Sequence, residues 1–309
     1  NAMLSVVNTI VPIFAIVLLG CVLRSRGFLP VNLVGPLNQL VYYLAIPAMI
    51  FRGVAKAPFE AQFDFTLILA TLIPVLMVFL IAAGTGRLLS VRRPFMATFI
   101  QSSFHGNIGY IGLAVCYYLL GEDGFTRASI VAAFLMLLQN VLAVFVLQLY
   151  APKMENGRSV GFFLKKVVVN PVILSALSGI VFSLLHLPLY DPVDRALSIL
   201  SGMALPLALL VIGASLSFGL IRSNWGMALG TGGLKLLILP GAGLFMYHAM
   251  QIPPAQFLPG LVLLATPTAT VTYVMAGEMN GSRDLASAAV SMNTLLSALT
   301  FILWLSRYI

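Results

Sequence analysis

Apolar residues fill this chain in ten long runs, which short polar segments separate. A helix that spans a membrane needs about 20 mostly apolar residues. The runs are continuous, and this favours helices over a β-barrel, whose strands alternate apolar and polar positions. The pattern therefore predicts ten membrane-spanning helices, at residues 4–24, 32–54, 64–89, 94–120, 125–150, 162–187, 193–220, 223–249, 254–278 and 283–307.

Several residues recur at one spacing in the two halves of the chain. A shift of 159 positions pairs Pro12 with Pro171, Gly20 with Gly179, Ala45 with Ala204 and Pro47 with Pro206. At a shift of 160, Asn107 meets Pro267, and both lie in the middle of the fourth span of their half. Because each half holds an odd number of spans, the second half must lie inverted in the membrane. Inverted repeats of this kind are common in secondary transporters.

The predicted fold is therefore an all-α integral membrane protein with ten transmembrane helices in two inverted five-helix repeats. Residues 1–150 form the first repeat and residues 161–309 form the second. Residues 151–160 join them as a polar linker, because the longest polar stretch of the chain lies there.

Composition supports a membrane protein and argues against other classes. The 309 residues are 60% hydrophobic and 8% charged, whereas soluble domains carry roughly 25% charged residues. Membrane lipid is thus an expected partner. The net charge of +8 does not indicate nucleic acid, since the basic residues lie in short loops between spans. Neither an enzyme motif nor a nucleotide-binding loop is visible, so we expect no cofactor, no metal and no enzymatic activity.

The basic residues also predict an orientation. Of the 17, five lie on the side of the N-terminus, eleven lie on the other side, and Lys235 lies inside a span. Cytoplasmic loops carry the excess of Lys and Arg. We therefore expect a cell inner membrane location with the linker in the cytoplasm and both termini outside.

Polar residues, glycines and a proline interrupt two spans near mid-membrane. The fourth span contains His105, Gly106, Asn107 and Gly109, and the ninth contains Thr266, Pro267 and Thr268. Such interruptions are tolerated where they line a cavity or are buried in protein, and matching ones in two halves indicate a transport site. The half-helices that begin there offer positive dipole ends, which suit an anion. Two ordinary kinks are the alternative.

The sequence resembles the auxin efflux carrier family over nearly its whole length. The motifs that carry the resemblance, in chain order, are residues 106–113 (GNIGYIGL), 170–171 (NP), 204–209 (ALPLAL), 213–216 (GASL), 273–278 (YVMAGE) and 293–297 (NTLLS). One departure is Ala114, where family members usually have proline after the glycine-rich stretch. The first break would then depend more on glycine flexibility than on a proline.

The resemblance implies two broken helices, 4 and 9, that cross at a site for small organic anions. It implies a scaffold of spans one, two, six and seven, a moving unit of the other six, and elevator-like transport. Asn107 matches the crossover asparagine that meets the substrate carboxylate, and Pro267 matches the crossover proline of the second half. Pro47 and Pro206 would bend scaffold helices beside the substrate path. A homodimer is also implied.

Further polar residues lie within the spans. Lys235 is midway along the eighth span, where a charge costs roughly 2.5–3.5 kcal/mol on insertion scales. It would be a fixed charge that attracts an anion or replaces a sodium ion, unless it snorkels to an interface. His105 is a structural hydrogen-bonding residue or a proton carrier. Gln139 and Asn140 face the crossover or bond between helices, and Glu278 has a structural or coupling role at a helix end.

The sequence thus predicts a secondary carrier of a small organic anion, such as a carboxylate. One alternative is a sodium- or proton-coupled symporter for a bulkier organic anion, in which a coupling cation is a second partner. The other is a membrane receptor domain that binds without transporting.

Overall fold

The regular structure is helical throughout the described residues. A computed structural model describes residues 2–150 and 169–309; the linker 151–160 and the start of the sixth predicted span lie outside them. The elements of the first half are α1 (Ala2–Ser25), α2 (Val31–Leu40), the π-helical turn η1 (Val41–Ala45), α3 (Ile46–Lys56), α4 (Phe59–Gln62), α5 (Phe65–Leu88), α6 (Arg93–Phe104), the π-helical turn η2 (Ile108–Gly112) and α7 (Leu113–Tyr150).

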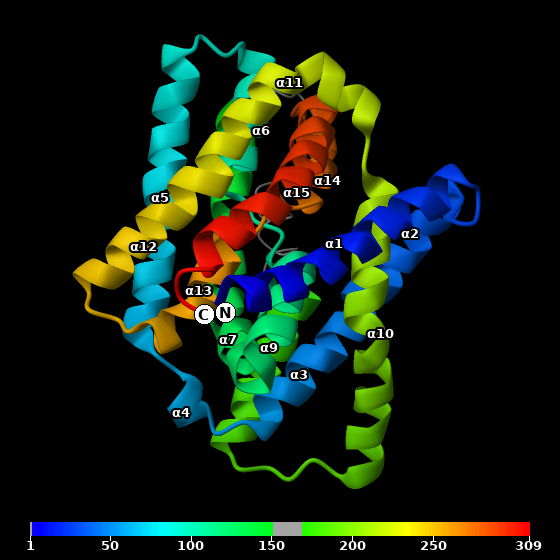
Figure 1. The fold of residues 1–309 in the computed structure, drawn as a ribbon, viewed down its shortest axis with the longest axis vertical. Helices are drawn as coiled ribbons and strands as arrows, with labels where there is room; N and C mark the ends of the chain where they lie inside the picture. The colour runs from blue at the N-terminus through cyan, green and yellow to red at the C-terminus, as the bar shows by residue number, and fades with distance from the viewer. Residues whose placement is uncertain (1, 151–168) are drawn as a thin grey trace.

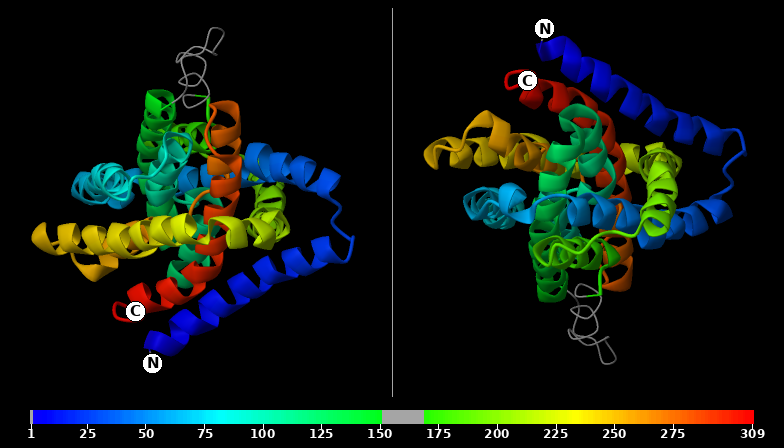
Figure 2. Two further views of the ribbon diagram at one scale, coloured as in Figure 1. Left: turned by 90° about the horizontal axis from the view of Figure 1, so that it is seen from above. Right: turned by 90° about the horizontal axis from the view of Figure 1, so that it is seen from below.

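The second half has the same character. Its elements are α9 (Pro171–Leu184), α10 (Asp191–Ser215), α11 (Phe218–Gly232), the π-helical turn η3 (Gly233–Ile238), α12 (Leu239–Ala249), α13 (Pro254–Leu264), α14 (Val271–Glu278) and α15 (Arg283–Leu305). Figure 1 shows α5 and α12 along one edge of the molecule and α2 and α10 along the other. The two termini lie close together in every view (Figures 1 and 2).

Within the described residues, seven helical stretches are long and apolar enough to cross a membrane. They make this a multi-pass membrane protein. Two further apolar helices, α9 and α13, are shorter. The count differs from the ten predicted spans for identifiable reasons. The ninth span is divided into α13 and α14. The fourth is divided at residues 105–107, and its second part runs into the fifth as α7, with non-helical backbone only at Gly121 (φ 71°).

The predicted boundary between the seventh and eighth spans is wrong by several residues. Helix α10 ends at Ser215 and α11 begins at Phe218, so Arg222 lies inside a helix rather than in a loop. The physical reason is a long-range contact. The Arg24 guanidinium donates hydrogen bonds to the carbonyls of Ala214 and Leu216, which the end of a helix otherwise leaves without partners.

Glycines let the helices of the two halves approach each other closely. A Cβ atom on Gly213 of α10 would lie 1.7 Å from the Val17 carbonyl oxygen of α1, and one on Gly20 of α1 would lie 2.2 Å from the Leu210 carbonyl oxygen of α10. Gly179 of α9 meets α3 similarly, because its Cβ would lie 3.2 Å from the Phe51 carbonyl oxygen. Small residues at such crossings are the usual basis of helix association in membranes.

The substitution Gly213→Ala should destabilise the fold, because the added methyl group meets backbone atoms that cannot move independently. We expect a loss of about 1–3 kcal/mol or more, as for other overpacked sites, measured as thermal unfolding in detergent. Gly202→Ala on the same helix meets nothing within 4 Å and is the matched control. Equal unfolding temperatures for the two variants would contradict the close crossing of α1 and α10.

Candidate functional site

The two interruptions predicted from the sequence lie against each other. Helix α6 ends at Phe104 and η2 begins at Ile108, while α13 ends at Leu264 and α14 begins at Val271. The Asn107 amide donates to the Pro267 carbonyl at 2.7 Å, and the Ala269 amide donates to the His105 carbonyl at 2.9 Å. Gly106 and Thr268 therefore form an antiparallel bridge. We call residues 105–107 and 265–270 together the crossing.

Side chains satisfy backbone groups that the breaks release. Gln139 of α7 donates from Nε2 to the Phe104 carbonyl at 3.0 Å and accepts from the Gly106 amide at 3.1 Å. The Thr268 hydroxyl donates to the Ser102 carbonyl at 2.8 Å. Non-helical backbone is tolerated inside a membrane only where its polar groups are paired or face water, so these contacts hold the crossing together.

Two glycines make room for the crossing. A Cβ atom on Gly106 would lie 2.4 Å from Thr266 Oγ1, and one on Gly112 would lie 2.9 Å from Thr266 Cγ2. Ala114 occupies the position where proline is usual in the family. The π-helical turn η2 connects the first break to α7 without a proline. The first break thus rests on glycine.

Lys235 is fully buried beside the crossing. Its Nζ donates to the Leu264 carbonyl at 2.8 Å and would lie 3.3 Å from a Cβ atom on Gly106. Leu264 ends α13, and the C-terminal end of a helix favours a cation. The alternative that Lys235 snorkels to an interface is therefore wrong.

The chain carries Lys235 on a π-helical turn, η3. Pro240, in the helix that follows, has no amide hydrogen, so it leaves the Leu236 carbonyl four residues earlier without its helical donor. Trp304 of α15 supplies one instead, from Nε1 at 2.8 Å. Turns of this kind occur frequently at functional sites.

Asn107 offers an unused donor at the crossing. The residue is 5% exposed, and its Nδ2 has no hydrogen-bond partner in the part of the chain that the structure describes. The backbone carbonyl of Asn107 accepts hydrogen bonds from the Ile111 and Gly112 amides at 3.2 and 3.1 Å. These bonds fix Asn107 at the start of η2. His105 Nδ1 is likewise unpartnered among these residues.

The geometry can be compared with known proteins. The family described as "Membrane transport protein" matches residues 5–305. The chain belongs to this family. It is the auxin efflux carrier family that the sequence motifs resemble.

Two relatives of this membrane transport protein match it along almost the full length of both chains. One, from Methanothermobacter thermautotrophicus, is named "Uncharacterized transporter"; it is 27% identical, over 96% of each chain. The other, from Rhizobium meliloti, is named "Putative malonate transporter"; it is 25% identical, over 96% of this chain and 94% of its own. Both names describe transporters.

The structure brings together most of the predicted site residues of this transport protein. Those at or against the crossing are His105, Gly106, Asn107, Thr266, Pro267, Thr268, Lys235 and Gln139. Gly109 lies in η2, two residues beyond the break. Asn140 donates to the Met136 carbonyl of its own helix at 2.8 Å, so no contact ties it to the crossing.

Three predicted residues lie on neighbouring elements. Pro47 follows η1 at the start of α3, and Pro206 is exposed within α10. Glu278 is exposed and is the eighth and last residue of α14.

Sequence reasoning missed Asn293 of α15 as a site residue. It is fully buried, and its Nδ2 donates to the Thr268 hydroxyl at 2.7 Å. Its Oδ1 would lie 2.6 Å from a Cβ atom on Gly232. The side-chain amide of Asn293, in the middle of an apolar span, was the sequence feature that could have indicated this role.

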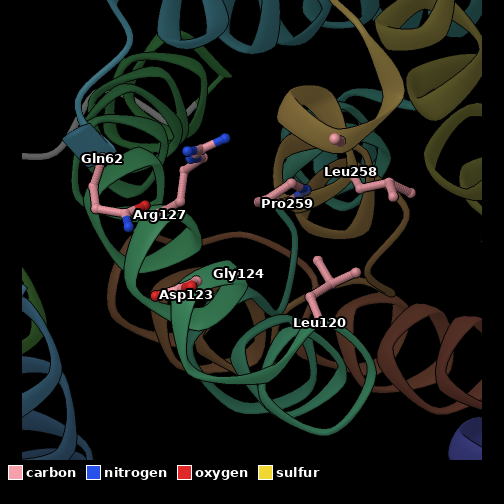
Figure 3. Close-up of a pocket in the computed structure, with 8 residues that line it drawn as sticks. Gln62, Leu120, Asp123, Gly124, Arg127, Leu258 and Pro259 are labelled. Atoms are coloured by element: carbon pink, nitrogen blue, oxygen red, sulfur yellow. The ribbon is translucent and has the colours of Figure 1, made fainter.

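A cavity of about 220 Å³ lies away from the crossing, between α4, α7 and α13. Figure 3 shows Gln62, Asp123 and Arg127 on one side of it and Leu258 and Pro259 on the other. The crossing itself is closely packed, because all of its residues except Thr270 are buried.

The substitution Gln139→Leu should destabilise the transporter, because it leaves the Phe104 carbonyl and the Gly106 amide buried without partners. Each such group costs about 1–3 kcal/mol. Thermal unfolding in detergent measures the loss. Asn140→Leu is the control, since Asn140 bonds only within its own helix; an equal loss in both variants would refute the role of Gln139.

Proposed function

We propose that this protein is a secondary carrier of small organic anions, and that a substrate carboxylate binds at the crossing. The observation that supports this most directly is the unpartnered Nδ2 of buried Asn107. A buried amide donor without a partner is unfavourable, and a carboxylate oxygen would satisfy it. The group lies where η2 begins, so nearby backbone amides favour an anion as well.

The helix ends at the crossing reinforce this preference. The chain resumes its helical course at Ile108 and at Val271, so two helix N-termini, with their partial positive charge, begin there. Neither has a side-chain cap. The amides of Ile108 and Thr272 already donate to the carbonyls of Gly106 and Ala269, so these helix ends support an anion through their partial positive charge.

Lys235 supports transport without a bound metal cation. Its ammonium group lies beside Gly106 and rests on the C-terminal end of α13, so it provides a fixed positive charge at the crossing. No aspartate or glutamate is buried in the described residues. A sodium-coupled symporter would be expected to hold acidic ligands behind the crossing, so the sodium-coupled form of the symporter alternative lacks support here. The membrane potential alone would drive the anion outward, and uptake would require a gradient or coupling.

We propose that the ten spans form two inverted repeats that move as scaffold and transport units. Gly20 and Gly179, 159 residues apart, support this because each lies at a close crossing with the other half: α1 with α10, and α9 with α3. If each helix is replaced by its counterpart in the other repeat, the pair α1 and α10 becomes the pair α9 and α3. The scaffold would comprise α1 to α3, α9 and α10, with Pro47 and Pro206 beside the substrate path.

Hydrogen bonds of Thr126 and Tyr110 would join the two units. The Thr126 hydroxyl of α7 donates to the Gly53 carbonyl of α3 at 3.5 Å. The Tyr110 hydroxyl of η2 donates to Asn38 Oδ1 of α2 at 2.8 Å. Elevator-like movement of the crossing would break these bonds. The protein would lie in the inner membrane, with residues 151–160 in the cytoplasm and both termini outside. It would function as a homodimer.

Malonate is the first substrate to test, because the Rhizobium meliloti relative carries that name. Purified protein in liposomes should take up labelled malonate or another small carboxylate. A strict sodium requirement would favour the symporter alternative. Binding without any transfer of carboxylate would favour the receptor alternative, in which case the carrier proposal fails.

Asn107→Ala should lower carboxylate uptake by about tenfold or more, because a hydrogen bond to a charged group is worth about 1.5–3 kcal/mol. The assay is initial uptake rate in liposomes. Asn224→Ala is the control, since Asn224 lies on α11 and bonds only to Leu220 and Ser223. Unchanged uptake by Asn107→Ala would exclude the crossing as the carboxylate site.

Lys235→Met should also reduce uptake about tenfold or more, since it removes a charge that little water screens. It should leave thermal stability near that of the parent, because loss of the ammonium group also removes the cost of burying it. Lys56→Met, at the half-exposed end of α3, is the control. Full uptake by Lys235→Met would show that the charge is dispensable.

A further inference from the structure

A rigid turn holds several arginines together where α5 passes into α6. The Ser90 amide donates to the Arg87 carbonyl at 3.0 Å, and the Val91 amide donates to the Gly86 carbonyl at 2.9 Å. Ser90 adopts the left-handed conformation, with φ at 52°. These are the bonds of a Schellman motif. Two residues later Arg93 begins α6, so its position relative to Arg87 is fixed.

Close packing below the turn adds to this rigidity. A Cβ atom on Gly86 would lie 2.5 Å from Met96 Sδ, so the glycine lets α6 lie directly against α5. The arginines are thus presented by a fixed hairpin.

An open groove of about 510 Å³ lies between this turn and the end of α7. We call it the arginine groove. Arg87 and Arg93 line it together with Val91, Leu149 and Tyr150. Its walls therefore combine two cations with apolar surface.

No acid among the residues that the structure describes neutralises the cations of the arginine groove. Arg87, Arg92 and Arg93 are exposed and make no ion pair with an acid in the described residues. The groove lining contains no acid. An anionic partner would complement this charge.

Apolar side chains beside the arginines indicate that this partner is a lipid. Leu88 is 84% exposed and Leu89 is 62% exposed, within the turn that carries Arg87. The described residues leave most of their surface uncovered, so in a membrane they would meet acyl chains. Tyrosine and arginine with adjacent leucines are typical of the interface between head groups and hydrocarbon. The loop charges also place this turn on the predicted cytoplasmic side.

We propose that the arginine groove binds the head group of an anionic phospholipid. The phosphate contacts Arg87 and Arg93, and the acyl chains run along Leu88 and Leu89. Basic pockets between membrane helices bind such head groups. The site is separate from the crossing and does not depend on the proposed function.

Native mass spectrometry of the full-length protein tests this with phosphatidylglycerol and with phosphatidylcholine as probes. We expect preferential retention of phosphatidylglycerol. The double variant Arg87→Gln/Arg93→Gln should lower that retention about 25-fold, because an arginine near an anionic surface is worth roughly fivefold in binding. Leu88→Ser/Leu89→Ser should lower it also.

The matched control is Arg26→Gln, an exposed arginine in the turn after α1 on the same predicted side. It should retain phosphatidylglycerol as the parent does, and unfolding temperatures of all variants should show that they are folded. Equal loss in Arg26→Gln would overturn the proposal, because the effect would then be one of net charge. Displacement of the lipid by excess inorganic phosphate, with no effect of the leucine substitutions, would identify a phosphate site instead and also overturn it.

Discussion

Backbone hydrogen bonding at the crossing is the constraint on which the rest of this structure depends. A chain that leaves helical geometry inside a membrane must pair each released amide and carbonyl. Here the two breaks do so mainly with each other, through Asn107 with Pro267 and Ala269 with His105. Gln139 pairs the Phe104 carbonyl before the first break and the Gly106 amide within it. Because the partners come from both halves of the chain, neither break is stable without the other.

This pairing explains why charge and donors gather at one point. Opening two helices produces two helix N-termini and two C-termini within a small volume. Lys235 lies at a C-terminal end, where it donates to the Leu264 carbonyl, and the N-terminal ends are where we propose that an anion binds. The π-helical turn before Pro240 allows a lysine to reach that position, and Trp304 supplies the hydrogen bond that the proline removes. The structure of the crossing and the anion preference that we propose for it thus have one origin.

The sequence predicted helices and both breaks and favoured a buried Lys235 over one that snorkels, because each depends on local composition in an apolar run. It did not predict which partner each polar group takes. Asn293 and Gln139 illustrate the difference: each is an amide in a span, and only the fold shows that they bond to Thr268 and to the first break. The end of α10 was misplaced for the same reason, since Arg24 caps it from 190 residues away.

A structure of the protein with bound malonate, determined by cryo-electron microscopy, tests the central claim most directly. We expect a carboxylate within hydrogen-bond distance of Asn107 Nδ2, next to the N-terminal ends of η2 and α14, with Lys235 still bonded to the Leu264 carbonyl. A carboxylate bound elsewhere, such as at Arg127 in the cavity between α7 and α13, with the crossing unchanged and empty, would contradict it.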